Sequence, residues 1–310
     1  MLNIAFRIDV GREIGLGHLT RMTALADAFR EMGYVFSFFR GEDEPVDYNG
    51  FDVVILDSYQ LNDEYIAGLN KKGRLVVCYD DNALYEYDCD VLINANLHAP
   101  DLVFHFGSKK PHLLLGGKYA LLRQEFRKAL PITVKEKASR IFVCFGGTDL
   151  RNFTPNAVMA LKDIPDVKIE TVIGTSVVCE GKMNELANID NVEIHQNSKN
   201  IAEIMNKCDI AVSAAGSMVY ELAALGLPAL LITQADNQNR IAEYLTRHGF
   251  MKHIGDWGNC DLFGLRYETM ALLSDYSRRQ RESEKLMKAV NRMGSETAAR
   301  EIVQLFKRNR

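Results

Sequence analysis

The chain has 310 residues, of which 47% are hydrophobic and 25% are charged, and its formal net charge is −4. This length suits two domains better than one, and the composition is that of a globular protein, which excludes disordered and fibrous classes. A weakly acidic chain has no basic field for nucleic acid, so we expect no nucleic-acid partner.

The apolar segments and the cysteines indicate in which cellular compartment the protein resides. No apolar stretch approaches the roughly 20 residues that cross a bilayer, so we expect no stable membrane insertion. The first apolar run contains Arg7 and Asp9 and therefore lacks the uninterrupted core of a signal peptide. The six cysteines are far apart, without a CxxC pair, which is typical of buried reduced thiols. We therefore predict a cytoplasmic protein.

Short apolar runs rich in β-branched residues alternate with helical patterns along the chain. Continuous apolar runs of this kind are typical of parallel strands that are covered on both faces. The predicted strands form two successive sets, at 3–8, 35–39, 52–56, 75–79 and 91–93, and then at 141–145, 168–173, 192–195, 210–213 and 229–233.

This repeated α/β pattern predicts a GT-B-like fold, in which two Rossmann-type doubly wound domains face a cleft. We expect an N-terminal domain at 1–126, a polar linker at 127–140 and a C-terminal domain at 141–310 that ends in a helical tail from about residue 267.

A strand, a glycine-rich turn and a helix follow one another at three places. Glycine leaves the helix amides open to an anion because no Cβ obstructs the approach. In two facing doubly wound sheets, the three turns would line the same crevice. The turn residues that we assign to substrate binding are Gly15, Gly17, Gly146, Gly147, Gly216 and Ser217.

His18 opens the helix that follows the first turn, in the segment IGLGHLTRM. The positive end of the helix dipole disfavours a charged imidazole, so we expect a neutral side chain that can accept a proton near pH 7. The alternative is a polar residue at the helix start that bonds to a neighbouring carbonyl group. The residue alone does not decide between these readings.

Two polar features of the second half suit a nucleotide sugar. Glu221 lies one turn into the helix that follows Gly216, where its carboxylate could accept hydrogen bonds from a ribose diol; an exposed helix residue is the alternative. Asn237 and Gln238 follow the last predicted strand and could donate amide hydrogen bonds to phosphate or hydroxyl groups. They could equally form a turn and a helix cap.

Acidic and aromatic side chains end two strands of the first set. Asp57 and Tyr59 follow one strand, and Asp80 and Asp81 follow the next. Adjacent acids can indicate Mg²⁺, but nothing in this spacing requires converging oxygen ligands. We therefore favour hydrogen-bonding or loop-capping roles, and we expect neither a metal nor a cofactor. Thr148 or Asp149 could cap the helix after the CFGGTD turn.

The substrate-binding set also includes charged residues near these turns. Arg123 lies in YALLRQEF, which could be a packed connector or could reach the cleft. The side chains assigned to substrate binding, beside the turn residues, are Arg7, Asp9, Arg21, Asp57, Asp81, Arg123, Glu221 and Gln238.

The motifs together resemble a known family. The segments FRID, IGLGHLTRM, LDSY, YDDN, DVLINAN, GGKYALLRQEF, CFGGTD, SAAGSMVYE and DNQ occur in the order found in the UDP-sugar hydrolases of pseudaminic acid biosynthesis. Those enzymes resemble GT-B glycosyltransferases, notably the lipid II-forming N-acetylglucosaminyltransferase, but transfer their sugar to water. The resemblance implies release of free 2,4-diacetamido-2,4,6-trideoxy-altrose, with flagellin or a surface polysaccharide as the destination.

The resemblance also implies roles for individual residues. The family's base falls on His18, its cleft tyrosine on Tyr59 and its cleft asparagine on Asn237, and we assign these three to catalysis. Its nucleotide loop and ribose-binding acid fall on Gly216, Ser217 and Glu221. The long C-terminal helical tail departs from shorter family members.

The resemblance therefore implies a metal-independent hydrolase whose partners are a UDP-linked diacetamido deoxy sugar and water. His18 would activate water for attack at C1 with inversion, while helix amides stabilise the departing diphosphate. Two alternatives remain open at this point. A GT-B glycosyltransferase would pass the sugar to another hydroxyl group, and a nucleotide-sugar-binding scaffold would keep Glu221 but have little need of His18.

Overall fold

A computed structural model describes residues 2–9, 17–41, 46–59, 61–70, 73–83, 86–147, 149, 151–174 and 185–308. The chain divides into two compact units, which are described separately. The first consists of Met1–Gln124 together with Asn291–Arg310, and the second of Glu125–Val290.

The described part of the first unit contains a six-stranded parallel sheet in the order β2-β1-β3-β4-β6-β8. Its strands are β1 (Asn3–Ile8), β2 (Val35–Arg40), β3 (Val53–Asp57), β4 (Leu75–Tyr79), β6 (Val91–Asn94) and β8 (His112–Leu115). The short strands β5 (Glu86–Tyr87) and β7 (His105–Phe106) form a separate pair. The five strands expected here are confirmed, whereas β8 was not expected.

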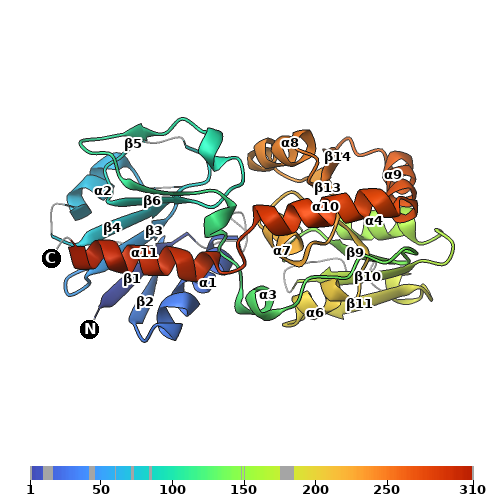
Figure 1. Cartoon of the computed structure of the whole chain (residues 1–310), viewed down its shortest axis with the longest axis horizontal. Helices are drawn as coiled ribbons and strands as arrows, with labels where there is room; N and C mark the ends of the chain where they lie inside the picture. Colours follow the sequence, from blue (N-terminus) through green and yellow to red (C-terminus); the bar gives the residue numbers. More distant parts are fainter. Residues whose placement is uncertain are drawn as a thin grey trace. The chain divides into compact units, whose positions relative to one another are not determined.

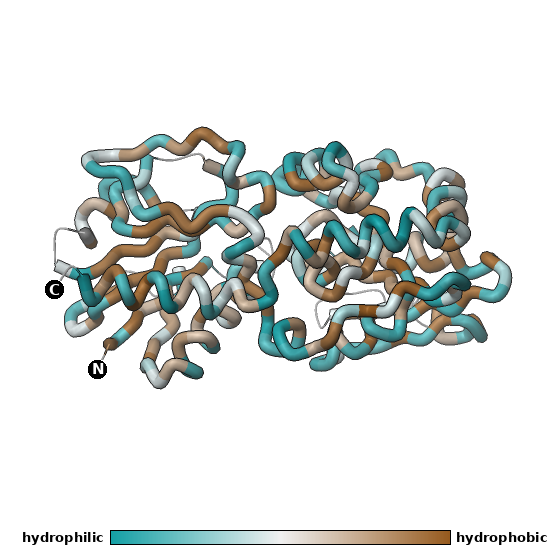
Figure 2. The backbone as a smooth tube through the Cα atoms, viewed as in Figure 1, coloured by the Kyte–Doolittle hydropathy of each residue, from teal (hydrophilic) through white to brown (hydrophobic). Residues whose placement is uncertain are grey.

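Alternate residues of this sheet enter two cores, as the period of two in a strand requires. On one face, Phe6 and Ile55 pack with residues of α1 (Gly17–Glu31) and α11 (Gly294–Arg308). On the other, Val54 and Val76 pack with residues of α2 (Asp63–Asn70). Figure 1 shows α11 running across the sheet, and Figure 2 shows hydrophobic strands beneath it. The sheet is therefore covered on both faces, as its apolar runs predicted.

The second unit repeats this plan with the order β11-β10-β9-β12-β13-β14 in the described residues, again all parallel. Its strands are β9 (Arg140–Cys144), β10 (Lys168–Ile173), β11 (Val192–Gln196), β12 (Ile210–Ala214), β13 (Ala229–Thr233) and β14 (Lys252–Asp256). The expected strands are confirmed within one residue at each end, and β14 is additional.

Helices connect and cover this second sheet. Ile141 and Val143 pack with Phe153 of α4 (Phe153–Leu161) and Leu272 of α9 (Leu262–Ser274) in one core. Its helices are α4 (Phe153–Leu161), α6 (Ile201–Asn206), α7 (Met218–Leu225), η4 (Asp236–Gln238), α8 (Asn239–Arg247), α9 (Leu262–Ser274) and α10 (Tyr276–Ala289). Among the described residues of either unit, no helix combines the length and apolar composition that a bilayer crossing would require.

The end of the chain returns to the first unit, whereas our expected boundaries kept residues up to 310 in the second. The reason is packing: α11 buries Ile302 and Val303 in the first core. A Cβ on Gly294 would lie 2.4 Å from the carbonyl oxygen of Ala120, so only glycine allows this approach. The Ser295 hydroxyl accepts a hydrogen bond from the backbone amide of Leu122 at 3.1 Å.

The expected linker is also packed rather than free. It begins within α3 (Gln124–Lys128) and ends at β9. The backbone amide of Ile132 donates to the carbonyl of Leu225, and the Arg279 guanidinium donates to the carbonyls of Lys135 and Glu136. These contacts hold the segment against the second unit.

Both strand orders reverse at a defined point. In the first sheet the reversal lies between β1 and β3, and in the second between β9 and β12. Doubly wound sheets bind ligands outside the carboxyl ends of the strands at such a switch point. The residues after these four strands are therefore the first places to seek a site.

Candidate functional site

At the switch point of the first unit, a buried ion pair lies at the end of β1. Arg7 pairs with Asp9, and each is 2% exposed. The backbone amide of Tyr59 donates to Asp9 Oδ2 at 2.9 Å, and the amide of Asp9 donates to the carbonyl of Asp57 at 3.1 Å. The pair thus has a scaffolding role: it fixes the backbone from which Asp57 and Tyr59 project.

His18 is buried in the first turn of α1 and contacts Asp57. The imidazole Nδ1 lies 2.7 Å from Asp57 Oδ1. Arg21 Nη2, which can only donate, lies 3.1 Å from the same nitrogen. The contact with the Asp57 carboxylate, which can only accept, is shorter at 2.7 Å, so we assign the ring hydrogen to Nδ1. A neutral His18 in this tautomer carries its lone pair on Nε2. The arrangement can therefore take up a proton at Nε2 while Asp57 holds the ring in place.

Arg21, one turn further along α1, holds Asp57 through two hydrogen bonds. Its Nε donates to Oδ2 at 2.6 Å and its Nη2 to Oδ1 at 2.5 Å. Burial alone would raise the pKa of Asp57, but the charge and hydrogen bonds of Arg21, together with His18, outweigh it and lower this pKa. Asp57 is therefore ionised at neutral pH. The guanidinium also lies 4.2 Å from the centre of the Tyr79 ring.

Tyr59 and Asp81 complete the network around His18. Arg21 Nη1 donates to Asp81 Oδ2 at 2.8 Å, and the Tyr59 hydroxyl lies 2.8 Å from both oxygens of Asp81. The Tyr59 ring meets the His18 ring edge to face at 4.7 Å. Burial, reinforced by the Asp81 carboxylate, raises the pKa of Tyr59 well above its ordinary value. Tyr59 therefore stays a neutral donor.

Asp80 differs from its neighbour Asp81. Its carboxylate accepts from the backbone amides of Asn82 and Ala83 at 3.0 and 2.6 Å, so it caps the loop after β4. The side-chain amide of Asn96 donates to the carbonyl of Asp81 at 3.3 Å. These acids therefore take part in hydrogen bonds within the protein, while the assignment of Asp57 and Asp81 to substrate binding stays a prediction.

At the switch point of the second unit, Asp149 organises the turn after β9. Its buried carboxylate accepts from the backbone amides of Phe153 and Thr154 at 3.0 and 2.9 Å, which confirms the expected cap of α4. Gly146 has a φ of +93°, a conformation that favours glycine. A Cβ on Gly174 would lie 1.9 Å from the carbonyl oxygen of Gly147, so two backbone segments meet closely there.

The second turn of this unit lies beside Gln238. Gly216 and Ser217 connect β12 to α7, and a Cβ on Gly216 would lie 3.6 Å from Gln238 Nε2. The other amide atom of Gln238, Oε1, accepts from the backbone amide of Gln234 at 2.9 Å. The first helical turn and the Gln238 amide can therefore present hydrogen-bond donors to one anion.

Two further predicted residues lie on the same elements. Glu221 is in the first turn of α7 and is 7% exposed, so the alternative of an exposed helix residue is excluded. Asn237 is exposed in η4, next to Gln238. These residues, unlike those around His18, all belong to the second unit.

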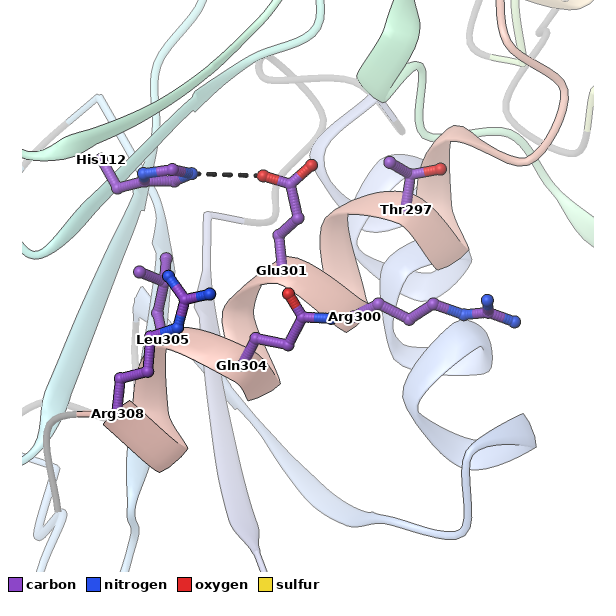
Figure 3. Close-up of a pocket in the computed structure, with 7 residues that line it drawn as sticks. All are labelled: His112, Thr297, Arg300, Glu301, Gln304, Leu305 and Arg308. Carbon is purple, nitrogen blue, oxygen red and sulfur yellow. Dashed lines mark hydrogen bonds and ion pairs between the residues drawn. The ribbon is translucent and has the colours of Figure 1, made fainter.

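Several predicted positions lie outside these two clusters. Gly15 falls outside the described residues, and Gly17 begins α1. Arg123 is half-buried just before α3. A pocket of about 470 Å³ lies elsewhere in the first unit, between β8 and α11, and none of its lining residues was predicted; Figure 3 shows it around His112 and Glu301.

The sequence did not single out Gln234 or Tyr79 for a site. Gln234 Nε2 donates to Asp149 Oδ1 at 3.1 Å and its backbone amide donates to Gln238 Oε1, so it links the turn after β9 to η4. Tyr79 ends β4 and packs on Arg21. Gln234 follows β13 directly and Tyr79 is the last residue of β4. These positions could have identified them, because other candidate site residues were chosen for lying at the carboxyl ends of strands.

The chain is similar to known proteins over both units. The Glycosyltransferase family 28 C-terminal domain matches residues 141–262. The UDP-2,4-diacetamido-2,4,6-trideoxy-beta-L-altropyranose hydrolase of Campylobacter jejuni is 26% identical over 274 residues, which cover 80% of this chain and 98% of that protein. The resemblance indicated by the motifs is thereby confirmed.

A second relative is longer than this chain. An uncharacterized protein of Methanocaldococcus jannaschii is 26% identical over 275 residues, which are 76% of this chain but 57% of that protein. The chain therefore corresponds to little more than half of that relative.

Among solved structures, MurG of Acinetobacter baumannii superposes with a TM-score of 0.66 at 15% identity, covering 97% of this chain and 99% of that one. This likeness concerns the fold. Together with the two parallel sheets, it confirms the expected GT-B fold of two Rossmann-type units.

Proposed function

We propose that the protein is an enzyme that hydrolyses a UDP-linked 2,4-diacetamido-2,4,6-trideoxy hexose to UDP and free sugar. The observation that carries this proposal is the contact between His18 and Asp57, because it leaves Nε2 as the proton acceptor in a buried network. A non-catalytic binding protein would have little need of such a pair.

In the proposed reaction, water is the nucleophile. His18 Nε2 accepts one proton from water as its oxygen attacks C1 of the sugar, and the bond between C1 and the diphosphate oxygen breaks. The electron pair of that bond leaves with UDP. Attack on the face opposite UDP inverts C1, and Asp57 stabilises the imidazolium that forms. No metal ion is required in this scheme.

The second unit binds the nucleotide in this proposal. The start of α7 at Gly216 and Ser217 offers backbone amides to the diphosphate, and the Gln238 amide adds a donor beside them. The carboxylate of Glu221, in the first turn of the same helix, accepts hydrogen bonds from the ribose hydroxyl groups. Asn237 would contribute its amide to the sugar or phosphate. These donors stabilise the charge that develops on the leaving diphosphate.

The sugar is assigned through the relative from Campylobacter jejuni, whose name specifies the UDP-linked diacetamido sugar that it hydrolyses. The product would then enter pseudaminic acid biosynthesis. Flagellin and a surface polysaccharide are the two destinations that we propose for that product.

A glycosyltransferase is the alternative, and the match to the glycosyltransferase family 28 domain favours it specifically. The two readings differ in what accepts the sugar. The test is incubation with the UDP sugar in H₂¹⁸O, with and without an added lipid or peptide hydroxyl acceptor.

A hydrolase releases UDP at the same rate in both reactions, and the UDP carries no ¹⁸O because the C1–O bond breaks. A transferase releases UDP only with an acceptor. Label in the β-phosphate would show cleavage of the P–O bond and would contradict the proposed attack at C1.

A further inference from the structure

A separate group of ionisable side chains lies in the second unit, on the edge strand β11 and its neighbour β10. Glu193 and His195 are two residues apart on β11 and therefore point to the same face. The strand register places Glu170 of β10 directly opposite Glu193. Two like charges opposite each other on neighbouring strands destabilise a sheet. A cation bound between the two carboxylates would offset this repulsion.

The ligand atoms of these residues already converge. Glu170 Oε2 lies 2.8 Å from His195 Nε2, and Glu193 Oε1 lies 3.8 Å from the same nitrogen. One atom from each of the three side chains fits within 4.8 Å of the others. Ligands of a tetrahedral zinc ion, bonded at about 2.0–2.2 Å, lie about 3.3–3.6 Å apart. Small side-chain rotations would give this spacing.

Arg140 occupies only one side of the buried carboxylate. Its guanidinium pairs with Glu170 Oε1, which leaves Oε2 directed at His195. A ligating carboxylate is commonly held by a hydrogen bond to its second oxygen, and Arg140 is placed to do this. Access from solvent is also provided, because the Glu193 side chain is 66% exposed while that of Glu170 is 1% exposed.

We propose that Glu170, Glu193 and His195 bind a divalent transition-metal ion, with zinc as the preferred occupant. One imidazole nitrogen and two carboxylate oxygens suit zinc, and water would fill the fourth position. The ion would link β11 to β10 and offset the repulsion between the two glutamates. This site is independent of the proposed hydrolysis and takes no part in it.

The competing explanation is a protonated His195 that bridges the two carboxylates without a metal. Isothermal titration of EDTA-treated, dialysed full-length protein with zinc chloride separates the two. Our proposal predicts that one zinc ion binds per chain at this site. It also predicts a larger dissociation constant for zinc in Glu193→Gln and in His195→Gln. Loss of a ligand should weaken binding by at least the roughly 10–100-fold that the loss of an outer partner costs.

The control variant is His112→Gln, which removes another histidine paired with a glutamate, Glu301, on the first unit. It should leave zinc binding unchanged. A cobalt titration adds a second readout, because a tetrahedral site gives strong visible absorption that both β11 variants should lose. Equal zinc binding in the wild type and both variants, or no stoichiometric binding, would overturn the proposal. Circular dichroism establishes that each variant is folded.

Discussion

Asp57 lies at the centre of the cluster in the first unit, because its carboxylate contacts both the imidazole of His18 and the guanidinium of Arg21. Replacing it by asparagine keeps the size of the side chain but removes the charge. The amide could then donate to Nδ1, which would move the ring hydrogen to Nε2 and remove the proton acceptor. We expect Asp57→Asn to lower kcat by about 10²–10⁴-fold with little change in the dissociation constant for UDP.

Steady-state kinetics and UDP titration of the same preparation test this expectation. Asp27→Asn is a suitable control, since Asp27 lies on the same helix but pairs with Arg30 at the surface. An unchanged kcat in Asp57→Asn would show that Asp57 does not orient the base.

At the scale of residues, the sequence predicted which side chains belong to the cluster around His18 but not which of them bond to one another. His18, Arg21, Asp57, Tyr59 and Asp81 were all chosen, and the structure brings them together. Their spacing along the chain does not reveal which oxygen of Asp57 faces the imidazole or that Arg21 bridges two acids. These details depend on the rotation of α1 against the sheet.

At the scale of elements, Asp149 secures the start of α4 and also holds Gln234. Asp149→Ala removes the acceptor for two helix amides, and we expect a loss of about 0.5–2 kcal/mol in the free energy of unfolding. UDP binding should weaken as well, because Gln234 supports Gln238 beside Gly216. Urea unfolding and UDP titration measure the two effects.

The matched control is Asp163→Ala, in which an acid with a largely exposed side chain is removed from the loop after α4. Asp163 pairs at the surface with Lys162, so its loss should change stability little. Equal stability of Asp149→Ala and the control would contradict the assigned cap.

The last helix, α11, is joined to the first sheet by a polar cluster around Glu301. Although burial raises the pKa of this carboxyl, hydrogen bonds from His112 and Tyr119 and the charge of Lys118 outweigh it and lower the pKa below the ordinary 4.5. A lowered pKa stabilises the fold above the unfolded value, and this contribution is lost as the pH falls through the folded value.

We therefore expect Glu301→Gln to reduce stability at neutral pH by about 0.2–1 kcal/mol, as for other partly exposed pairs. The difference from wild type should disappear as the pH falls through the lowered pKa of Glu301. Thermal unfolding of both proteins from neutral to acidic pH measures this difference in stability. A difference that persists unchanged in acid would exclude the charge of Glu301 as its cause.

The elements themselves were largely predictable. β1, β4, β10 and β13 begin and end at the predicted residues, because continuous apolar runs bounded by polar turns define buried parallel strands. The edge strands β8 and β14 were missed. Their partly exposed segments HLLL and KHIGD mix polar and apolar residues, so the apolar pattern is weaker.

At the scale of the whole molecule, the chain begins and ends in the same unit. The pattern of helices predicted a terminal tail, but no local signal specifies which sheet α11 covers. That choice depends on packing between residues nearly 300 positions apart, such as Phe6 and Ile302 in one core.

Ile302→Ala tests this division. Truncation of a fully buried isoleucine leaves a cavity and should cost about 2–5 kcal/mol in the free energy of unfolding. Hydrogen exchange should rise in residues 1–124, with much less change in 125–290. Lys307→Ala, at an exposed position of the same helix, is the control. Equal increases in both units would contradict the assignment of α11 to the first.

The central claim is that His18 activates water for hydrolysis of a UDP sugar, and proton NMR of the reaction tests it most directly. The substrate is UDP-2,4-diacetamido-2,4,6-trideoxy-β-L-altropyranose, without an added acceptor, and His18→Ala is followed in parallel. We predict release of UDP and free sugar, with C1 inverted in the first product formed, and a rate about 10²–10⁴-fold lower in the variant. Equal rates for the wild type and His18→Ala, or no release of sugar by the wild type, would contradict it.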